Sequence, residues 1–233
     1  MLEAAEAVAA SIDASIRQES GQFSDAASVL DGVASLLESS LLRQESGAGE
    51  DYRYRMLETV REYGPEPLAQ AGEAVLARNV HAEYFIGLKE WLTPNKCDPP
   101  GRFEDRLRNI ETEYPNLWAA LDWLKETGDA ERVLHLAGSL AVFWHHRGYL
   151  REGRERLEWA LTGREDAKTA SRGWALAGLS LIVWTQGDPD AAIPLAKAAL
   201  ESAEEINVIE LKALSKHILG IVESARGQLA SAQ

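Results

Sequence analysis

Apolar residues recur at helical spacing along most of the chain, and the pattern is most regular from about residue 74 onward. Apolar positions three and four residues apart fall on one face of an α-helix, so they predict amphipathic helices packed around a common core. The exception is the segment 41–56, where alternating residues flank a Glu-Ser-Gly-Ala-Gly-Glu-Asp turn and predict one β-hairpin. We therefore expect a mainly α-helical protein with a single small hairpin.

Proline and glycine divide the first part of the helical pattern. Apolar residues predict a helix over about 24–37, with Ser24 as its N-cap, and this helix leads directly into the hairpin. A second helix over 57–63 is expected to stop at the Gly-Pro-Glu-Pro segment 64–67, because proline lacks an amide donor. This stop predicts a first domain over residues 1–66.

Connecting helices are predicted over residues 67–128. One long helix over 73–91 ends in a proline-rich connector at 93–101. Two short helices follow over about 103–112 and 115–127. The break is placed before the second of these because proline is well tolerated at the first position of a helix.

An internal repeat occupies residues 129–233. Three similar apolar segments each end at a glycine, and these glycines, Gly148, Gly187 and Gly227, are 39 and then 40 residues apart. Each is expected to end one helix in a turn that a second helix follows, so the region predicts about two and a half helix-turn-helix units. The third unit stops part-way into its second helix at Gln233, so we expect the chain to be a fragment of a longer protein.

Composition narrows the class of protein. The chain has 37 acidic and 24 basic side chains, a net charge of −13, which disfavours binding to nucleic-acid phosphates. Its only cysteine is Cys97, so neither an intrachain disulfide nor a cysteine-rich metal site can form. The first ten residues lack the basic segment of a signal peptide, and the apolar stretch 173–187 is too short to cross a bilayer. We expect a soluble cytoplasmic protein without a membrane partner.

The repeats resemble tetratricopeptide repeats (TPR), although their spacing exceeds the usual length of about 34 residues. The longer spacing is similar to that in the sensor region of bacterial signal-transduction ATPases of the STAND class. Residues 2–8, the Val-Ala-Ser-Leu-Leu-Glu-Ser-Ser-Leu-Leu block at 33–42 and the Tyr-Arg-Met-Leu-Glu-Thr-Val-Arg-Glu-Tyr block at 54–63 look like the winged helix of that class. Residues 106–121 resemble its first superhelix segment. The resemblance implies a partial winged helix followed by a TPR-like α-superhelix.

The same resemblance carries expectations about nucleotides. Proteins of this class combine an effector, a nucleotide-binding domain, a winged helix and the repeat superhelix. The chain contains no Gly-x-x-x-x-Gly-Lys-[Ser/Thr] phosphate-binding loop, so we expect no enzymatic activity and no bound cofactor. In relatives the triplet at 56–58 is often Met-His-Asp, whose histidine reports on bound ADP. Here Leu57 and Glu58 occupy these nucleotide-sensor positions, and Leu57 has no donor for a phosphate.

Candidate metal-binding and catalytic residues are few. His135, His145 and His146 have no carboxylate or cysteine at a ligand spacing, so no metal site is predicted. No serine stands with a histidine and an acid in a recognisable nucleophile turn, so no catalytic residues are predicted either.

A stripe of arginines offers a possible anion site. Arg147, Arg151 and Arg154 are spaced so that they share one helix face. Glu155 and Glu158 stand four residues after the last two arginines, where ion pairs form on a helix surface. We therefore favour an ordinary solvated face over an anion site.

A groove on the repeats is the strongest candidate binding site. In tetratricopeptide arrays the first helix of each unit lines the concave face. Aligning the units on their glycines predicts eight inward-facing side chains: His135, Val142, His145, Trp174, Leu181, Trp184, His217 and Ile221. Aromatic and imidazole groups among apolar neighbours suit a peptide or a small ligand. The alternative is that these side chains pack the superhelix or contact repeats that are missing from this chain.

Three functional hypotheses follow. The first is a regulatory sensor module of a STAND-type ATPase regulator, which binds a protein or small ligand in the groove and couples that binding to an upstream nucleotide-binding domain. The second is a DNA-binding winged-helix regulator with a repeat dimerisation arm, which the 13 acids and 5 bases of residues 1–66 disfavour. The third is a free-standing repeat scaffold.

Overall fold

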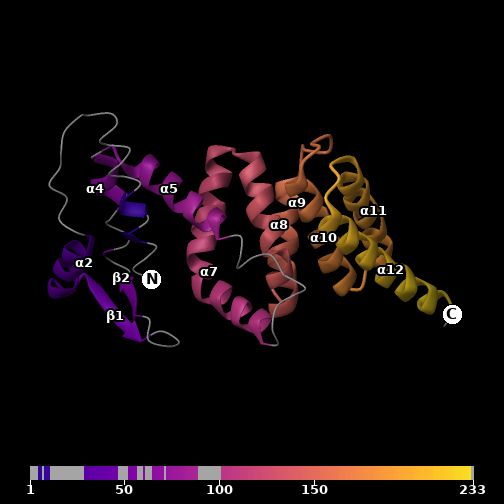
Figure 1. Ribbon diagram of the computed structural model, residues 1–233, viewed down its shortest axis with the longest axis horizontal. Helices are drawn as coiled ribbons and strands as arrows, with labels where there is room; N and C mark the ends of the chain where they lie inside the picture. The colour runs from indigo at the N-terminus through magenta and orange to yellow at the C-terminus, as the bar shows by residue number, and fades with distance from the viewer. Residues whose placement is uncertain are drawn as a thin grey trace. The chain divides into compact units, whose positions relative to one another are not determined.

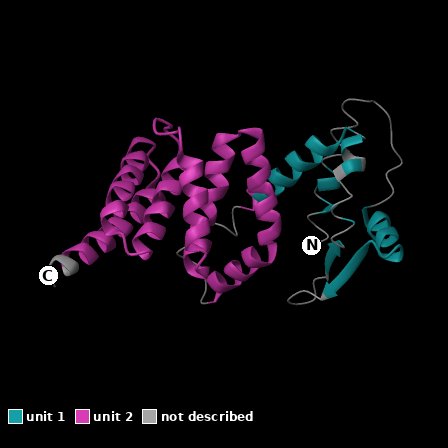
Figure 2. Ribbon diagram, turned by 180° about the vertical axis from the view of Figure 1, so that it is seen from behind, with its two compact units in different colours: residues 1–85 teal, residues 86–233 magenta. Residues whose placement is uncertain are grey.

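The computed structural model describes residues 5–6, 8–10, 29–46, 52–56, 60, 65–70, 72–88 and 101–231 (Figure 1). Backbone contacts divide the chain into two compact units, unit 1 over residues 1–85 and unit 2 over residues 86–233 (Figure 2). The domain boundaries predicted after residues 66 and 128 stay predictions.

Unit 1 contains the predicted hairpin. Helix α2 (Val29–Glu38) is followed by Ser40, whose positive φ of 58° reverses the direction of the chain. Strand β1 (Leu42–Ser46) then pairs with strand β2 (Tyr52–Met56) in antiparallel register, so that Leu42 lies opposite Met56. The hairpin predicted over 41–56 is confirmed, and a helix precedes it as predicted, although residues 24–28 lie outside the described part of the chain.

The remaining helices of unit 1 differ in part from the prediction. The helix predicted over 57–63 lies outside the described residues except for Val60, which is helical. Helix α4 (Pro65–Gln70) begins within the Gly-Pro-Glu-Pro segment, where no helix was predicted. The reason is that the first amides of a helix have no partner within it, so proline can begin a helix without losing a hydrogen bond. Helix α5 (Ala74–Gly87) corresponds to the helix predicted over 73–91, whose last residues are not described. The sensor positions Leu57 and Glu58 also lie outside the described residues.

Unit 2 is an array of helices joined by short turns. Its helices are α7 (Arg102–Thr127), α8 (Ala130–Arg147), α9 (Leu150–Leu161), α10 (Ala170–Thr185), α11 (Pro189–Glu205) and α12 (Ile209–Ser231) (Figure 1). Helix α10 is central, because it packs against α8, α9, α11 and α12. Trp144, Leu157, Ile182 and Leu211 are fully buried in the core of this array. The predicted fold class, mainly α-helical with a small hairpin, is confirmed.

Helix α7 corrects one prediction. The sequence predicts two short helices separated before Pro115, whereas α7 is one helix of 26 residues with Pro115 in its interior. An interior proline removes a hydrogen bond and bends the helix at a cost of about 3 kcal/mol. Ile110 and Leu117, on either side of the proline, are both buried in the core. Burying such side chains contributes about 1.5–3 kcal/mol each, so packing of a continuous face offsets the local penalty.

Two of the three predicted turn glycines are confirmed. Gly148 and Gly187 have φ values of 78° and 90°, a conformation that glycine adopts without strain, and each ends the first helix of a helical pair. The prediction for Gly227 is wrong, because this residue lies inside α12. Gly227 lacks the positive φ of the two turn glycines, and a glycine inside a helix costs only about 1 kcal/mol relative to alanine, so it does not end α12.

Glycines also allow α8 and α10 to pack closely. A Cβ atom placed on Gly178 of α10 would lie 2.2 Å from the Cβ of Ala141 of α8. A Cβ on Gly138 of α8 would lie 2.9 Å from the amide nitrogen of Ala175. Both distances are shorter than van der Waals contact, so the two helices can pack this closely only because glycine has no Cβ atom at these positions.

Candidate functional site

An open depression lies between the end of α10 and one face of α12. Its volume is about 620 Å³, and it is lined by Trp184 of α10 and by Lys216, His217, Gly220, Ile221, Ser224 and Ala225 of α12. The α12 residues recur at intervals of three and four, so they form one stripe along the helix. We call these seven residues the α10–α12 depression.

Apolar and polar groups are separated within the α10–α12 depression. The indole of Trp184 and the side chain of Ile221 are half-buried and supply apolar contact area. Lys216, His217 and Ser224 are exposed and supply hydrogen-bond donors. The helix backbone is bare at Gly220, where an added Cβ would meet no atom within 4 Å.

The Lys216 ammonium in the depression has no partner within the described part of the chain. Neither Lys216 nor His217 forms an ion pair or a side-chain hydrogen bond with any residue that the structure describes. The lining contains no aspartate or glutamate. This differs from neighbouring cations, since Lys212 lies 3.1 Å from Glu204 and Arg226 lies 3.0 Å from Asp190.

The structure brings together three of the eight predicted groove residues. Trp184, His217 and Ile221 line the depression, whereas His135, Val142, His145, Trp174 and Leu181 do not. None of the eight is fully buried: His217 is exposed and the other seven are half-buried. Whether these residues form one binding groove stays a prediction.

The prediction missed four lining residues: Lys216, Gly220, Ser224 and Ala225. One of them carried a signal in the sequence. Ser224 stands three residues before Gly227, the same offset that relates Trp184 to Gly187 and His145 to Gly148. Extending the alignment through this position would have found it.

The arginine stripe is neutralised by carboxylates. Arg151 pairs with Glu155 at 3.0 Å and Arg154 with Glu158 at 2.7 Å, which confirms the predicted surface ion pairs. The prediction that the three arginines share one helix face is wrong, because Arg147 ends α8 before the turn at Gly148, whereas Arg151 and Arg154 lie on α9. The Arg147 guanidinium turns toward α7, where it contacts the carboxylates of Glu104 at 2.8 Å and Glu111 at 3.3 Å. Hydrogen bonding and charge from these two carboxylates raise the pKa of the Arg147 guanidinium. Arg151 and Arg154 therefore form surface ion pairs, and Arg147 stabilises the contact between α7 and α8. An anion could bind these arginines only by displacing their carboxylate partners.

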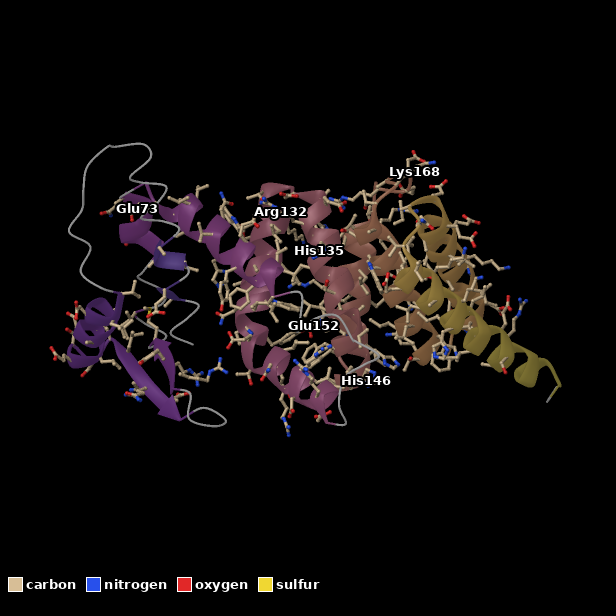
Figure 3. All side chains as sticks on the ribbon, in the orientation of Figure 1. Glu73, Arg132, His135, His146, Glu152 and Lys168 are labelled. Atoms are coloured by element: carbon tan, nitrogen blue, oxygen red, sulfur yellow. The ribbon has the colours of Figure 1, made fainter. Side chains whose placement is uncertain are left out.

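His135 lies apart from His145 and His146 along α8. Figure 3 shows His135 in the upper half of α8 and His146 near its lower end. His145 and His146 contact each other edge to face with ring centroids 5.0 Å apart, and burial lowers the pKa of both imidazoles. Within the described ranges, no three His, Cys, Asp or Glu side chains are grouped as a metal site requires.

No helix described for this chain is long and apolar enough to span a membrane.

A buried aromatic cluster joins α7 to α8. The indole Nε1 of Trp144, which is fully buried, donates a hydrogen bond to the hydroxyl oxygen of Tyr114 at 2.9 Å. Burial raises the pKa of the Tyr114 hydroxyl, and the nearby carboxylate of Glu152 raises it further. The ring of Tyr149 stacks on Tyr114 with centroids 5.3 Å apart. The hydroxyl is thus kept neutral, and its contacts are structural.

Comparison with known proteins gives three similar relatives, and no family model and no solved structure matches the chain. The relatives come from Mycobacterium bovis and from two strains of Mycobacterium tuberculosis, and each carries the name "Putative HTH-type transcriptional regulator". Each is 37% identical to this chain over 199 residues, which covers 80% of the chain and 21% of the relative. The chain therefore spans about a fifth of the length of the curated relatives that it matches.

Proposed function

We propose that this chain is the regulatory part of a bacterial transcription regulator, similar to proteins named HTH-type transcriptional regulators. The observation that supports this most directly is the 37% identity over 199 residues to proteins named as HTH-type transcriptional regulators. The helical array of unit 2 would bind a protein or small-molecule effector. That binding would be coupled to an upstream nucleotide-binding domain in the same polypeptide, as the resemblance to the STAND class implies.

The mechanism we propose is a shift between two arrangements of the regulator. An effector that binds the helical array better in one arrangement favours that arrangement, by no more than the difference between its two affinities. The chain itself would be neither an enzyme nor a cofactor-binding protein, because it lacks a phosphate-binding loop. Its role would be to bind the effector and to transmit that binding to the upstream nucleotide-binding domain.

Direct DNA binding by this chain is the second candidate, favoured by the name of its relatives. The charge of the chain opposes it. Residues 1–66 carry 13 acids and 5 bases, and a protein surface of that sign repels the phosphates of DNA. We therefore place any DNA-reading element of the parent protein outside this chain. A free-standing repeat scaffold is the third candidate.

The coding sequence upstream of Met1 separates the first candidate from the third. A phosphate-binding loop encoded there supports a sensor module, and a start codon at Met1 with no upstream coding sequence supports a scaffold. Gel shifts at physiological salt and calorimetry with magnesium ATP test the purified chain, for which we expect no binding in either assay. A sequence-selective DNA shift would favour the winged-helix candidate. Magnesium-dependent ATP binding would contradict the proposal that nucleotides bind only to the upstream domain.

A further inference from the structure

We infer that the α10–α12 depression binds a small aromatic carboxylate, that is, a free molecule with a planar apolar body and one negative charge. The inference deepens the proposed function, because it names the class of effector. It rests on the proposed function only in calling the bound molecule an effector. The binding itself can be measured on the purified chain.

The shape of the depression suits a small planar molecule. Its volume of about 620 Å³ lies within the range of about 300–1,000 Å³ that is typical of small-ligand pockets. Trp184 provides an aromatic wall, and the bare backbone at Gly220 leaves room for a ring to lie against α12. Aromatic rings gain from stacking or edge contacts with an indole in addition to the apolar area that they bury.

Charge indicates that the ligand is an anion. Lys216 and His217 stand side by side on α12, and neither has a carboxylate partner among the residues that the structure describes. Lys212 and Arg226 on the same helix both pair with carboxylates, whereas Lys216 has no such partner among the described residues. A carboxylate next to the Lys216 ammonium forms a charge-assisted hydrogen bond, and the Ser224 hydroxyl can donate a second bond.

A single lysine favours one negative charge over several. Phosphate-rich ligands and nucleic acids are generally held by several cations or by backbone amides at a helix start, and the lining offers neither. The depression is largely open to solvent, and Trp184 and Ile221 are the large apolar residues of its lining, so it gives no continuous apolar track for a long peptide. We therefore assign the site to a free small molecule.

The experiment compares three naphthalene probes of nearly equal size and different charge on the whole chain. The probes are 1-naphthaleneacetate, 2-(1-naphthyl)ethanol and 1-naphthylmethylamine, titrated by calorimetry and by the indole N–H signal of Trp184 in ¹H–¹⁵N spectra. We expect the carboxylate to bind about tenfold more tightly than the alcohol, because a charge-assisted bond is replaced by a neutral one, and the amine to bind most weakly.

Three variants locate the binding. Gly220→Leu fills open space in the depression with a good helix former, so it should abolish binding while the circular dichroism spectrum stays unchanged. Lys216→Gln should weaken carboxylate binding about fivefold and leave alcohol binding unchanged. Lys197→Gln is the matched control, because Lys197 is exposed on α11, outside the depression, and also forms no ion pair with the described residues.

The outcomes separate this inference from the proposed function. Absence of binding by all three probes, equal affinity for carboxylate and alcohol, or carboxylate binding that survives Gly220→Leu would overturn the ligand class. Carboxylate binding with the expected effects of the variants would support it, even if the parent protein proved not to regulate transcription. In that case only the proposed regulatory role would fail.

Discussion

Replacing Gly178 with alanine is expected to destabilise unit 2, although alanine is the better helix former. The new methyl group would lie 2.2 Å from the Cβ of Ala141 on α8. Two carbon atoms in contact need about 3.5–4.0 Å, so α8 and α10 would have to separate by roughly 1.5 Å at this point. Because α10 is the central helix of unit 2, that separation also disturbs its packing against its other neighbours.

Two opposing terms set the magnitude. Forcing an extra methyl group into a packed core costs about 1–3 kcal/mol, and the upper end applies here because both clashing atoms are attached directly to helix backbones. The gain in helix propensity from glycine to alanine is about 1 kcal/mol. The net loss should be about 2 kcal/mol. For a unit of this size the midpoint of thermal unfolding should fall by roughly 4–8 °C.

Tryptophan fluorescence during urea unfolding is a suitable assay. All seven tryptophans lie within residues 86–233, so the signal reports on unit 2. Gly220→Ala is the matched control, because an added Cβ there meets no atom within 4 Å, and it should stabilise the unit by up to about 1 kcal/mol.

A second substitution tests the cause directly. In Gly178→Ala combined with Ala141→Gly, the methyl group of residue 178 would face the Cα of residue 141 at 3.7 Å, an ordinary contact. The double variant should therefore be more stable than Gly178→Ala alone. If Gly178→Ala proves as stable as the native chain while Gly220→Ala shows the expected gain, the close approach of α8 and α10 does not control stability and the reasoning is refuted.

Three further variants address α7 and α8. Tyr114→Phe should cost about 1–3 kcal/mol, because it leaves the indole N–H of the buried Trp144 without its acceptor, as measured by urea unfolding. Arg147→Ala should cost about 1 kcal/mol, because it removes two ion pairs between α8 and α7, and the loss should shrink in high salt. Burial lowers the pKa of His145 and His146, so the unfolded chain binds more protons than the folded one below about pH 6.5. The unfolding temperature should thus fall from pH 7.5 to 5.5, and replacing both histidines with glutamine should reduce that fall.

Controls for these substitutions come from the same surfaces. Tyr149→Phe keeps the stacked ring and should cost far less than the change at Tyr114, so equal losses would mean that the hydrogen bond to the indole is not the cause. Arg151→Ala removes a fully solvated ion pair and should change stability by less than about 0.5 kcal/mol. An unchanged pH profile in the double histidine variant would show that other groups govern the acid dependence.

The sequence predicts the parts of the fold that depend on periodicity. The alternating residues over 41–56 and the positions of Gly148 and Gly187 favour a hairpin and two helix ends locally. Tertiary packing does not oppose these preferences, so the hairpin and both turns are present. The two errors in unit 2, at Pro115 and Gly227, have a common origin. Each residue disfavours a helix locally, by about 3 kcal/mol for an interior proline and about 1 kcal/mol for a glycine, and the helix nevertheless continues through it.

The candidate site was predicted only in part, for a different reason. Trp184, His217 and Ile221 were all found by aligning the repeat units on their glycines. Lys216 was missed, because its significance lies in the absence of a partner among the described residues, which depends on where every nearby carboxylate lies in three dimensions. Pairing of this kind cannot be read from spacing beyond one helix.

Glycine shows most clearly why the structure is needed to interpret this sequence. Gly148 is required by a positive φ and Gly178 by the closeness of another helix, whereas Gly220 has neither constraint in the structure. Glycine within a helix costs about 1 kcal/mol relative to alanine, and at Gly178 the helix crossing accounts for that cost. At Gly220 no contact with the described part of the chain accounts for it, and the bare backbone faces the α10–α12 depression beside Trp184. A stabilising Gly220→Ala variant that also binds the naphthalene carboxylate less tightly would show that this position trades stability for a ligand. A stabilising variant with unchanged binding would show that the glycine has no such role.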